Sequence, residues 1–193
     1  MGLDMYLYEK EYLSPYSDED KFNKVAAAVG AMTTDEVENT YDMPHPKPAY
    51  LTSEVAYWRK SNQIHTWFVE NVQAGVDDCS SYDVSVEQLT ELRDLCQKVL
   101  ERAKVEDGTF KNGWRSYTND DGERVSEDVM QEGLVIVNID EIKELLPNSS
   151  GFFFGSTEYS EYYLKDLEQT VKMIDAALEG KDQWATFEYR ASW

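Results

Sequence analysis

The amino-acid sequence predicts an α+β fold in which three long helices pack on a small mixed or antiparallel sheet that includes both terminal strands. Apolar residues recur three and four positions apart over 53–72, 86–103 and 163–178, which is the periodicity of helices with a buried face. Apolar and polar residues alternate over 1–9 and 184–193, which is typical of strands with one buried face. The two ends of the chain are therefore expected to lie in one sheet.

Length and composition indicate one globular domain. The chain has 193 residues, 41% of them hydrophobic, which is the composition of a folded protein rather than of a disordered acidic chain. We expect a single α+β domain over residues 1–193, with a hairpin excursion near 105–133. Two cysteines are too few for a disulfide framework and favour a reduced, cytosolic setting.

The strongest compositional signal is acidity, with 38 acidic against 18 basic residues and a net charge of −20. This balance counts against direct nucleic-acid binding, because phosphate contacts require a basic face. Three interpretations remain open: solubility, recognition of a basic protein surface, and cation binding. The chain start has no signal-peptide pattern and no segment approaches the ~20 apolar residues of a membrane span, so we expect a soluble cytoplasmic protein that does not bind membranes.

The first third of the chain contains a predicted short helix and a connector. Ser17 can cap a helix that begins with three acidic residues and ends before Gly30. Residues 33–52 have the composition of a loop. Three prolines within 44–48 favour a stiff connector over a ligand motif for another domain.

Residues 53–72 are predicted to form the central helix. At roughly 100° per residue, their apolar side chains cover most of the helix circumference. A narrow polar stripe remains, made of Thr66, Arg59, Glu70 and Gln63. We therefore expect this helix to be covered on more than one side.

The rest of the chain alternates turns, strands and helices. Residues 75–81 form a predicted turn, and Ser85 with Gln88 matches a capping box for the helix over 86–103, which we expect to pack antiparallel to 53–72. Turns at Asn112-Gly113 and 119–122 indicate the hairpin. The remaining predictions are a buried strand over 134–137, a short helix capped by Asn138, a strand over 151–155, and a third long helix from Ser156 or Thr157 to Gly180.

His65 is one of two histidines and lies in the middle of the apolar arc of the predicted central helix. Such a position favours a core imidazole hydrogen-bonded to a neighbour, with a pocket-lining role as the alternative. A metal role is weakly supported, since no second histidine or cysteine stands at helical ligand spacing.

Asp77, Asp78 and Cys79 follow the predicted central helix directly. Adjacent acids can ligate a hard cation, but one pair lacks the regular oxygen spacing of a calcium loop, so a turn is the favoured interpretation. Cys79 as a nucleophile would need His65 as its base, and nothing in the sequence brings the two together.

Arg59 lies on the polar stripe and is a better candidate than His65 for meeting a partner. Tyrosines near the start of the third helix are mostly packing residues, although one or two of them can edge a cavity with Arg59. A polar–aromatic rim of this sort suits a small molecule or a peptide. The candidate ligand- or partner-binding residues are Arg59, His65, Asp77, Asp78 and Tyr159.

Motifs of the common enzyme classes are absent from the sequence. The chain has no GxxxxGK[ST], GxGxxG, HExxH, GxSxG or paired CxxC pattern. We therefore predict no catalytic residues, no metal site and no cofactor.

Three blocks of sequence point to a family. They are Met1-Gly-Leu-Asp-Met-Tyr-Leu, the segment Glu54-Val-Ala-Tyr-Trp-Arg-Lys with Ile64-His and Trp67-Phe, and Gly151-Phe-Phe-Phe-Gly-Ser-Thr-Glu-Tyr159. Together they resemble a group of small, mostly uncharacterised proteins encoded by bacteriophages and prophages. The resemblance implies a small soluble protein made inside a bacterium and implies no reaction.

Two classes of function follow as hypotheses. The first is a phage-encoded binding protein without enzymatic activity, which modulates a host process such as defence by engaging a basic protein surface or by holding a small ligand. The second is a hydrolase or nucleotide-modifying enzyme that uses His65 with Asp77, Asp78 or Cys79. The environment of His65 distinguishes them, since a catalytic histidine needs a pocket and a partner within hydrogen-bond reach.

Overall fold

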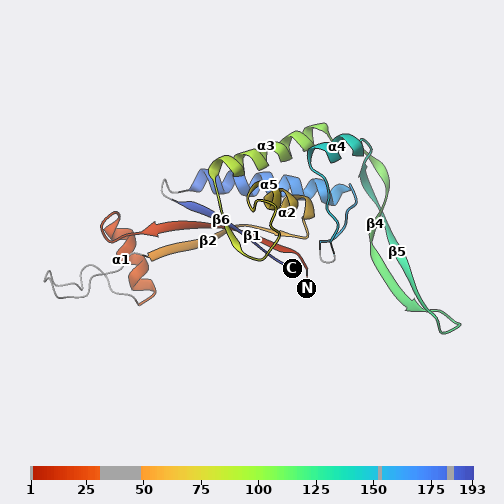
Figure 1. The fold of residues 1–193 in the computed structure, drawn as a ribbon, viewed down its shortest axis with the longest axis horizontal. Coiled ribbons are helices and arrows are strands. Elements are labelled where there is room, and N and C mark those ends of the chain that lie inside the picture. Colours follow the sequence, from red (N-terminus) through yellow and green to blue (C-terminus); the bar gives the residue numbers. More distant parts are fainter. Residues whose placement is uncertain (1, 31–48, 152–153, 182–184) are drawn as a thin grey trace.

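The computed structural model describes residues 2–30, 49–151, 154–181 and 185–193. This part of the chain is α+β, with antiparallel sheets that include both terminal strands, as predicted (Figure 1). In chain order its elements are β1 (Asp4–Leu13), α1 (Glu19–Ala28), β2 (Ala49–Arg59), α2 (Asn62–Asn71), β3 (Ser81–Val84), α3 (Val86–Arg102), β4 (Val105–Thr118), β5 (Arg124–Ile136), α4 (Ile139–Leu145), α5 (Glu161–Gly180) and β6 (Thr186–Ser192).

The main sheet has four antiparallel strands in the order β2-β1-β6-β3. The first and last strands of the chain are direct neighbours, with Asp4 opposite Ser192 and Lys10 opposite Thr186. On its other side β1 pairs with β2, where Asp4 lies opposite Arg59. The end of β2 therefore lies at an edge of the sheet, close to the start of β1.

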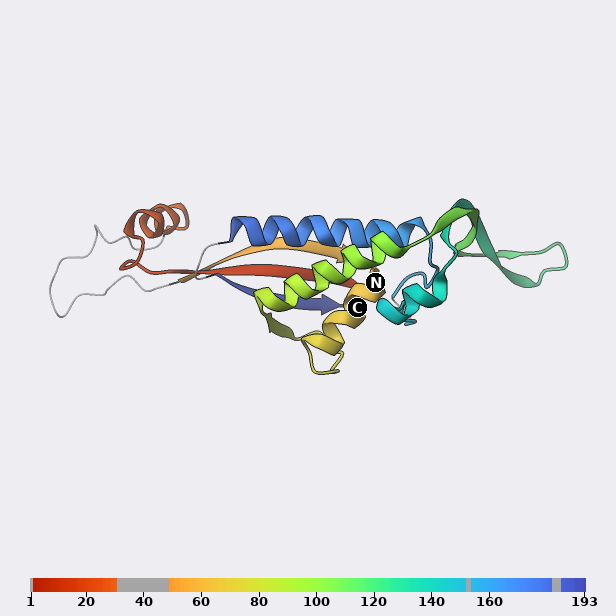
Figure 2. The ribbon, with the colours of Figure 1, turned by 90° about the horizontal axis from the view of Figure 1, so that it is seen from above.

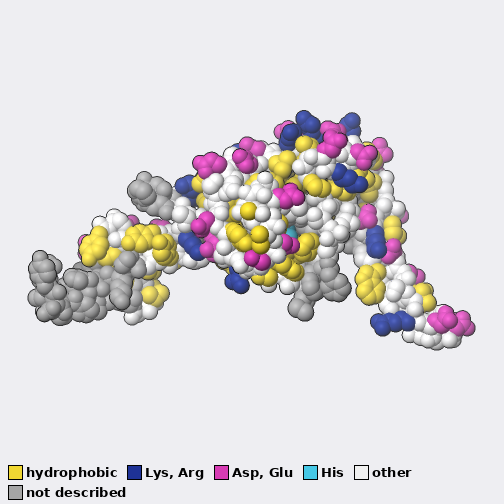
Figure 3. Space-filling model, viewed as in Figure 1, with side chains coloured by type: hydrophobic (Ala, Val, Ile, Leu, Met, Phe, Trp, Pro, Cys, Tyr) yellow, Lys and Arg dark blue, Asp and Glu magenta, His cyan; other side chains and the backbone are white. Residues whose placement is uncertain are grey.

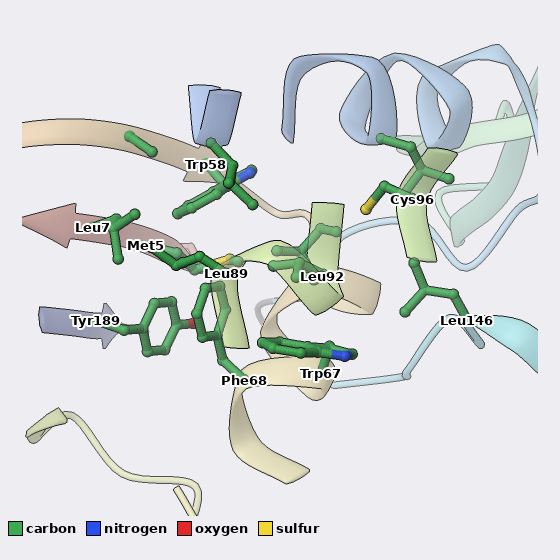
Figure 4. Packing of buried hydrophobic residues seen from close by; sticks show 14 of the residues in the cluster. Met5, Leu7, Trp58, Trp67, Phe68, Leu89, Leu92, Cys96, Leu146 and Tyr189 are labelled. Carbon is green, nitrogen blue, oxygen red and sulfur yellow. The ribbon is translucent and has the colours of Figure 1, made fainter. Parts of the chain in front are cut away.

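The hydrophobic core lies between the sheet and the helices (Figure 4). Alternate strand residues such as Met5, Leu7 and Tyr189 are fully buried, because one face of a strand carries every second side chain. The Tyr189 ring stacks on Phe68 of α2 with ring centroids 3.8 Å apart. Burial of a side chain of this size contributes about 1.5–3 kcal/mol, so this cluster is a main source of stability.

Helices α3 and α5 pack against each other along the sheet and run in opposite directions (Figure 2). Ser85 and Gln88 form the predicted capping box at the start of α3. The predicted buried stripe of α3 is also present, since Leu89, Leu92, Cys96 and Val99 are fully buried. The partner of α3 is α5 rather than the segment 53–72, so the predicted antiparallel pair was wrong.

The predicted central helix over 53–72 was also wrong. Residues up to Arg59 belong to β2, and only Asn62–Asn71 are helical. In β2, Ala56 and Trp58 are buried while Tyr57 is exposed, which is strand alternation. Plotted as one helix, residues 53–72 show a wide apolar arc. The arc arises because the first part is a strand with one buried face and the second part is a buried helix.

Other boundaries differ from the predictions for related reasons. The described residues contain two long helices rather than three, because the segment 53–72 is divided between a strand and a short helix. The third long helix begins at Glu161 with Ser160 as its cap, not at Ser156 or Thr157. Residues 49–52 of the predicted loop lie in β2, and Gly151, Phe154 and Gly155 of the predicted strand are not in a strand. Residues 31–48, 152–153 and 182–184 lie outside the described part of the chain.

Strands β4 and β5 form a two-stranded ribbon that projects from the main body (Figures 1 and 2). Where the sequence predicts a tight turn, Asn112-Gly113 instead lies at an irregularity within β4, and the strands reverse at Asn119–Gly122. Residues 134–136 of the predicted buried strand are the end of β5, where Ile136 is buried but Leu134 is exposed, and Val137 follows the strand and is exposed. Phe110 is one buried contact between the ribbon and the body, against Tyr162 of α5, and Ile136 at the end of β5 is another.

Charged side chains of both signs are visible on one face of the molecule. Acidic side chains are scattered over the face shown in Figure 3, with Lys and Arg among them. Among the described helices, none combines the length and the apolar character that crossing a membrane would require.

Candidate functional site

A polar cavity of about 440 Å³ opens beside the end of β2 and the first turns of α5. Its volume is within the roughly 300–1,000 Å³ range of small-molecule sites. Side chains from five parts of the chain line it: Arg59, Lys60, Gln63, Asn112, Asn148, Ser156, Glu158, Ser160, Tyr162, Tyr163 and Asp166. We refer to this site as the Arg59 cavity.

A sharp bend between β2 and α2 brings two basic residues to the cavity. Arg59 ends the strand, and Lys60 has a φ of 61°, a left-handed conformation that only a small share of non-glycine residues adopt. The amide of Lys60 donates to the carbonyl of Leu3 at 2.8 Å, and that of Asn62 donates to the carbonyl of Lys60 at 2.9 Å. The bend is thus fixed on both sides by backbone hydrogen bonds.

Asn62 connects this bend to the loop that forms the other side of the cavity. Its side-chain amide donates to the carbonyls of Phe154 and Ser156, at 3.1 and 2.8 Å, and its Oδ1 accepts from the amide of Ser149 at 2.8 Å. Asn62 is only 1% exposed, so these bonds satisfy a buried polar group. They hold the residues before α5 in place.

Gly155 is required where this loop meets the bend. Its φ is 89°, and a Cβ at this position would lie 2.9 Å from the Lys60 Cβ and 3.2 Å from the Lys60 carbonyl oxygen. A side chain would therefore be strained in itself and would push the loop away from the bend.

The two basic residues of the cavity lack ion-pair partners among the described residues. Nine ion pairs form in that part of the chain, and none includes Arg59 or Lys60. Other described cations, such as Lys98 and Lys172, also form no ion pair, and what distinguishes Arg59 and Lys60 is that they are adjacent and line one cavity. They remain available to an anion.

Asp166 is one of the two carboxylates that line the cavity, and its hydrogen-bond partners are neutral groups. Gln63 Nε2 donates to its Oδ2 at 3.1 Å, and Ser61 also bonds to the carboxylate. Burial raises the pKa of Asp166, and the bonds from Ser61 and Gln63 oppose that rise. Thr170, one turn further along α5, accepts from Trp58 Nε1 at 2.8 Å, which ties α5 to β2 behind the cavity.

Tyr159, Tyr162 and Tyr163, the tyrosines near the start of α5, differ in their positions. Tyr162 and Tyr163 line the Arg59 cavity, and the hydroxyl of Tyr163 donates to the carbonyl of Leu146 at 2.7 Å. Tyr159 lines a neighbouring depression of about 330 Å³, which shares Asn148 and Glu158 with the Arg59 cavity. The Tyr159 hydroxyl accepts from the amide of Asn148 at 2.9 Å, so Tyr159 supports the wall between the two hollows.

His65 is buried away from this cavity and forms a chain of hydrogen bonds. Its Nε2 lies 3.1 Å from Asp77 Oδ1, and its Nδ1 lies 2.8 Å from the Tyr189 hydroxyl. A carboxylate only accepts, so Nε2 carries the proton and Tyr189 donates to Nδ1. Burial lowers the pKa of His65, while Asp77 opposes this effect, and the ring is only 1% exposed. The arrangement links α2, the loop after it and β6.

Asp78 and Cys79 do not join this chain. Asp78 accepts from the amide of Ser80 at 2.8 Å and from the Tyr82 hydroxyl at 3.2 Å, as expected of a turn. Cys79 is exposed, and both ring nitrogens of His65 bond elsewhere. The other cysteine, Cys96, is buried, which raises the pKa of its thiol to about 12.

The sequence interpretation identified Arg59 but missed Lys60, Gln63 and Asp166. Within the described ranges, no cluster of three or more His, Cys, Asp or Glu residues is arranged to hold a metal ion. A usable signal for Asp166 was its position one turn before Thr170, on the buried side of α5 beside Tyr163 and Leu167. A carboxylate next to a buried stripe is rarely placed there without a partner.

Comparisons with known proteins leave the cavity as the main basis for inferring function. No protein-family model, curated protein or solved structure matches this chain. Function is therefore inferred from the side chains that the fold brings together.

Proposed function

We propose that this protein is a binding protein without enzymatic activity, which holds a small anionic ligand in the Arg59 cavity. The observation that carries the proposal is the pair of adjacent basic residues, Arg59 and Lys60, which line a polar cavity and have no ion-pair partner among the described residues. The ligand supplies the missing negative charge.

The chemistry of the two side chains supports an anion. A guanidinium presents several N–H donors in a planar fork that matches a carboxylate or a phosphate, and an ammonium adds a compact positive charge. Hydrogen bonds in which the donor or the acceptor is ionised are roughly twice as strong as neutral ones. The amides of Asn112 and Asn148, which also line the cavity, can donate to the same ligand.

The small ligand is better supported than a basic protein partner. The Arg59 cavity is a defined site for a small ligand, whereas the acidic side chains on the one face in Figure 3 are not gathered into a patch for a basic partner. The phage context suggested by the sequence blocks would place the protein in an infected bacterium. Withholding a small anion from a host process is the role that we propose there.

The enzyme alternative draws on one observation, the hydrogen bond between His65 and Asp77. A general base also needs access to a substrate proton, and the His65 ring is 1% exposed and enclosed by Phe154, Tyr189 and Trp193. Tyr189, which forms the other hydrogen bond of His65, is also fully buried. The binding role is therefore the one we propose.

Thermal unfolding in the presence of defined anions tests the proposal. The probes are acetate, succinate, inorganic phosphate and adenosine 5′-monophosphate, because a ligand of the folded state raises Tm. We expect at least one of them to raise the Tm of the wild type and not that of Arg59→Gln/Lys60→Gln. The matched control is Lys98→Gln/Arg102→Gln on exposed positions of α3, which makes the same change in charge.

Two results would count against the proposal. One is a wild-type Tm that none of the four anions changes. The other is an equal rise in Tm for the wild type and for Arg59→Gln/Lys60→Gln, which would mean that the anion binds elsewhere.

A further inference from the structure

We infer that the ligand of the Arg59 cavity is a zwitterion, whose anionic group contacts Arg59 and Lys60 and whose ammonium group contacts Asp166. The inference rests on the proposed function, since it specifies what the same cavity binds. It goes beyond the proposed function because an anion alone would contact only the basic side chains of the cavity lining.

The cavity contains acidic as well as basic side chains. Asp166 and Glu158 line it together with Arg59 and Lys60. Opposite charges that share a cavity commonly form ion pairs, but these four residues form none with one another. Positive and negative groups are thus held apart around one space.

The surroundings of Asp166 explain why it is the cation-binding residue. Its described hydrogen-bond partners are Ser61 and Gln63, both neutral. These partners orient the carboxylate, but they do not supply the positive charge that a partly desolvated carboxylate needs. Gln63 is itself buried, so its position fixes that of Asp166.

A zwitterion satisfies both parts of the cavity at once. Its anion neutralises the two cations, and its ammonium group donates to the Asp166 carboxylate, with Glu158 as a second acidic neighbour. A ligand with an anion alone leaves Asp166 unpaired, and an amine alone leaves Arg59 and Lys60 unpaired. The shared chemistry is an ammonium group and either a carboxylate or a phosphate, as in amino acids and short peptides or in aminoalkyl phosphates.

Isothermal titration with matched probes tests this inference. Glycylphenylalanine carries both charges, its N-acetyl derivative lacks the ammonium group, and its C-terminal amide lacks the carboxylate. Phosphoethanolamine tests the phosphate source. We expect at least one zwitterion to bind at least tenfold more tightly than either blocked derivative of the peptide, or than ethyl phosphate in the phosphate series.

Variants of Asp166 assign the effect to this residue. Asp166→Asn should weaken zwitterion binding at least tenfold and leave the N-acetyl derivative unaffected, whereas Asp166→Glu should retain part of the preference. Because Asn keeps an acceptor for Gln63 and removes a partly desolvated charge, we expect ligand-free Asp166→Asn to melt no lower than the wild type. That result keeps a loss of binding separate from a loss of folding.

The outcomes separate this inference from the proposed function. If acetate, succinate, phosphate or the nucleotide binds through Arg59 and Lys60 while no zwitterion is preferred, the inference is overturned and the proposed function stands. Equal zwitterion binding by the wild type and Asp166→Asn also overturns it. If no probe of either series binds, both are overturned.

Discussion

Lys60 combines a left-handed backbone with a side chain that lines the cavity. A non-glycine residue in this conformation costs roughly 1–2 kcal/mol relative to the right-handed region, and a glycine avoids this cost. The strain is tolerated because hydrogen bonds on both sides of Lys60 fix the bend. Strained residues cluster at functional sites, where the surrounding structure determines their geometry.

Substitution of Lys60 can separate strain from charge. Lys60→Ala removes the charge and keeps the strain, whereas Lys60→Gly removes both. We expect Lys60→Gly to be more stable than Lys60→Ala by about 1 kcal/mol in urea unfolding. Both variants should lose anion binding to a similar extent. Equal stability of the two variants would show that the bend carries no backbone strain.

His65 is expected to make stability depend on pH. Burial lowers its pKa in the folded protein below the usual 6.5, so the unfolded state binds more protons between the two values. The contribution of His65 to the free energy of unfolding is therefore complete above about pH 6.5 and declines as pH falls below that value. Asp77, Tyr189, Phe154 and Trp193 surround the ring, and of these Asp77 opposes the shift.

The measurement is urea unfolding of the wild type and His65→Gln at pH 7.5, 6.5 and 5.5. The stability advantage of the wild type should shrink as pH falls, because only the wild type carries this histidine. Changes common to both proteins, including those from their many carboxylates, cancel in the difference. An advantage that grows toward pH 5.5 would mean that Asp77 outweighs burial.

At the scale of single elements, sequence patterns predicted the start of α3, whereas α1 is capped by Asp18 rather than Ser17 and α5 by Ser160 rather than by Ser156 or Thr157. The capping box at Ser85 located α3, and strand alternation located β1 and β6. The boundary between β2 and α2 could not be predicted, because it has no Gly or Pro. It depends on Lys60 in a left-handed conformation, which sequence rarely signals.

The capping box provides a test at this scale. Ser85→Ala removes the acceptor for the amide of Gln88, which lies 3.1 Å from the serine oxygen. We expect a loss of about 1 kcal/mol in the free energy of unfolding. Ser126→Ala, on the exposed face of the ribbon, should change stability by less than about 0.5 kcal/mol. Equal effects would show that the cap contributes nothing beyond a surface serine.

At the scale of the whole molecule, the candidate site depends on contacts that are distant in sequence. Arg59 and Asp166 come from separate parts of the chain and share a cavity because α5 packs against β2. No local pattern contains that information. The sequence indicated Arg59 as an exposed cation and tyrosines near the start of α5, but the pairing of Gln63 with Asp166 emerged only from the fold.

The ribbon is expected to be dispensable for the stability of the body. Two-stranded ribbons are marginally stable in water, and past Phe110 most of its side chains are exposed. Replacing residues 112–129 by Asn-Gly would join Lys111 to its partner Met130 through a favoured hairpin turn. We expect Tm to change by less than about 3 °C, as a change of well under 1 kcal/mol implies.

A matched variant gives the contrasting result for the ribbon. Phe110→Ala should lower the free energy of unfolding by about 3 kcal/mol, because its ring is buried against Tyr162. A large loss of Tm on shortening the ribbon would show that its outer part supports the body.

The pairing of β1 with β6 also bears on how the chain reaches its fold. In the middle of the sheet β1 pairs with β6, whose residues 186–192 are synthesised after the other three strands of that sheet. Until they emerge, β1 can pair only with β2, and β3 has no strand beside it. Closing a sheet across nearly the whole chain raises the contact order and slows folding. The sheet is therefore completed only after its other three strands have been synthesised.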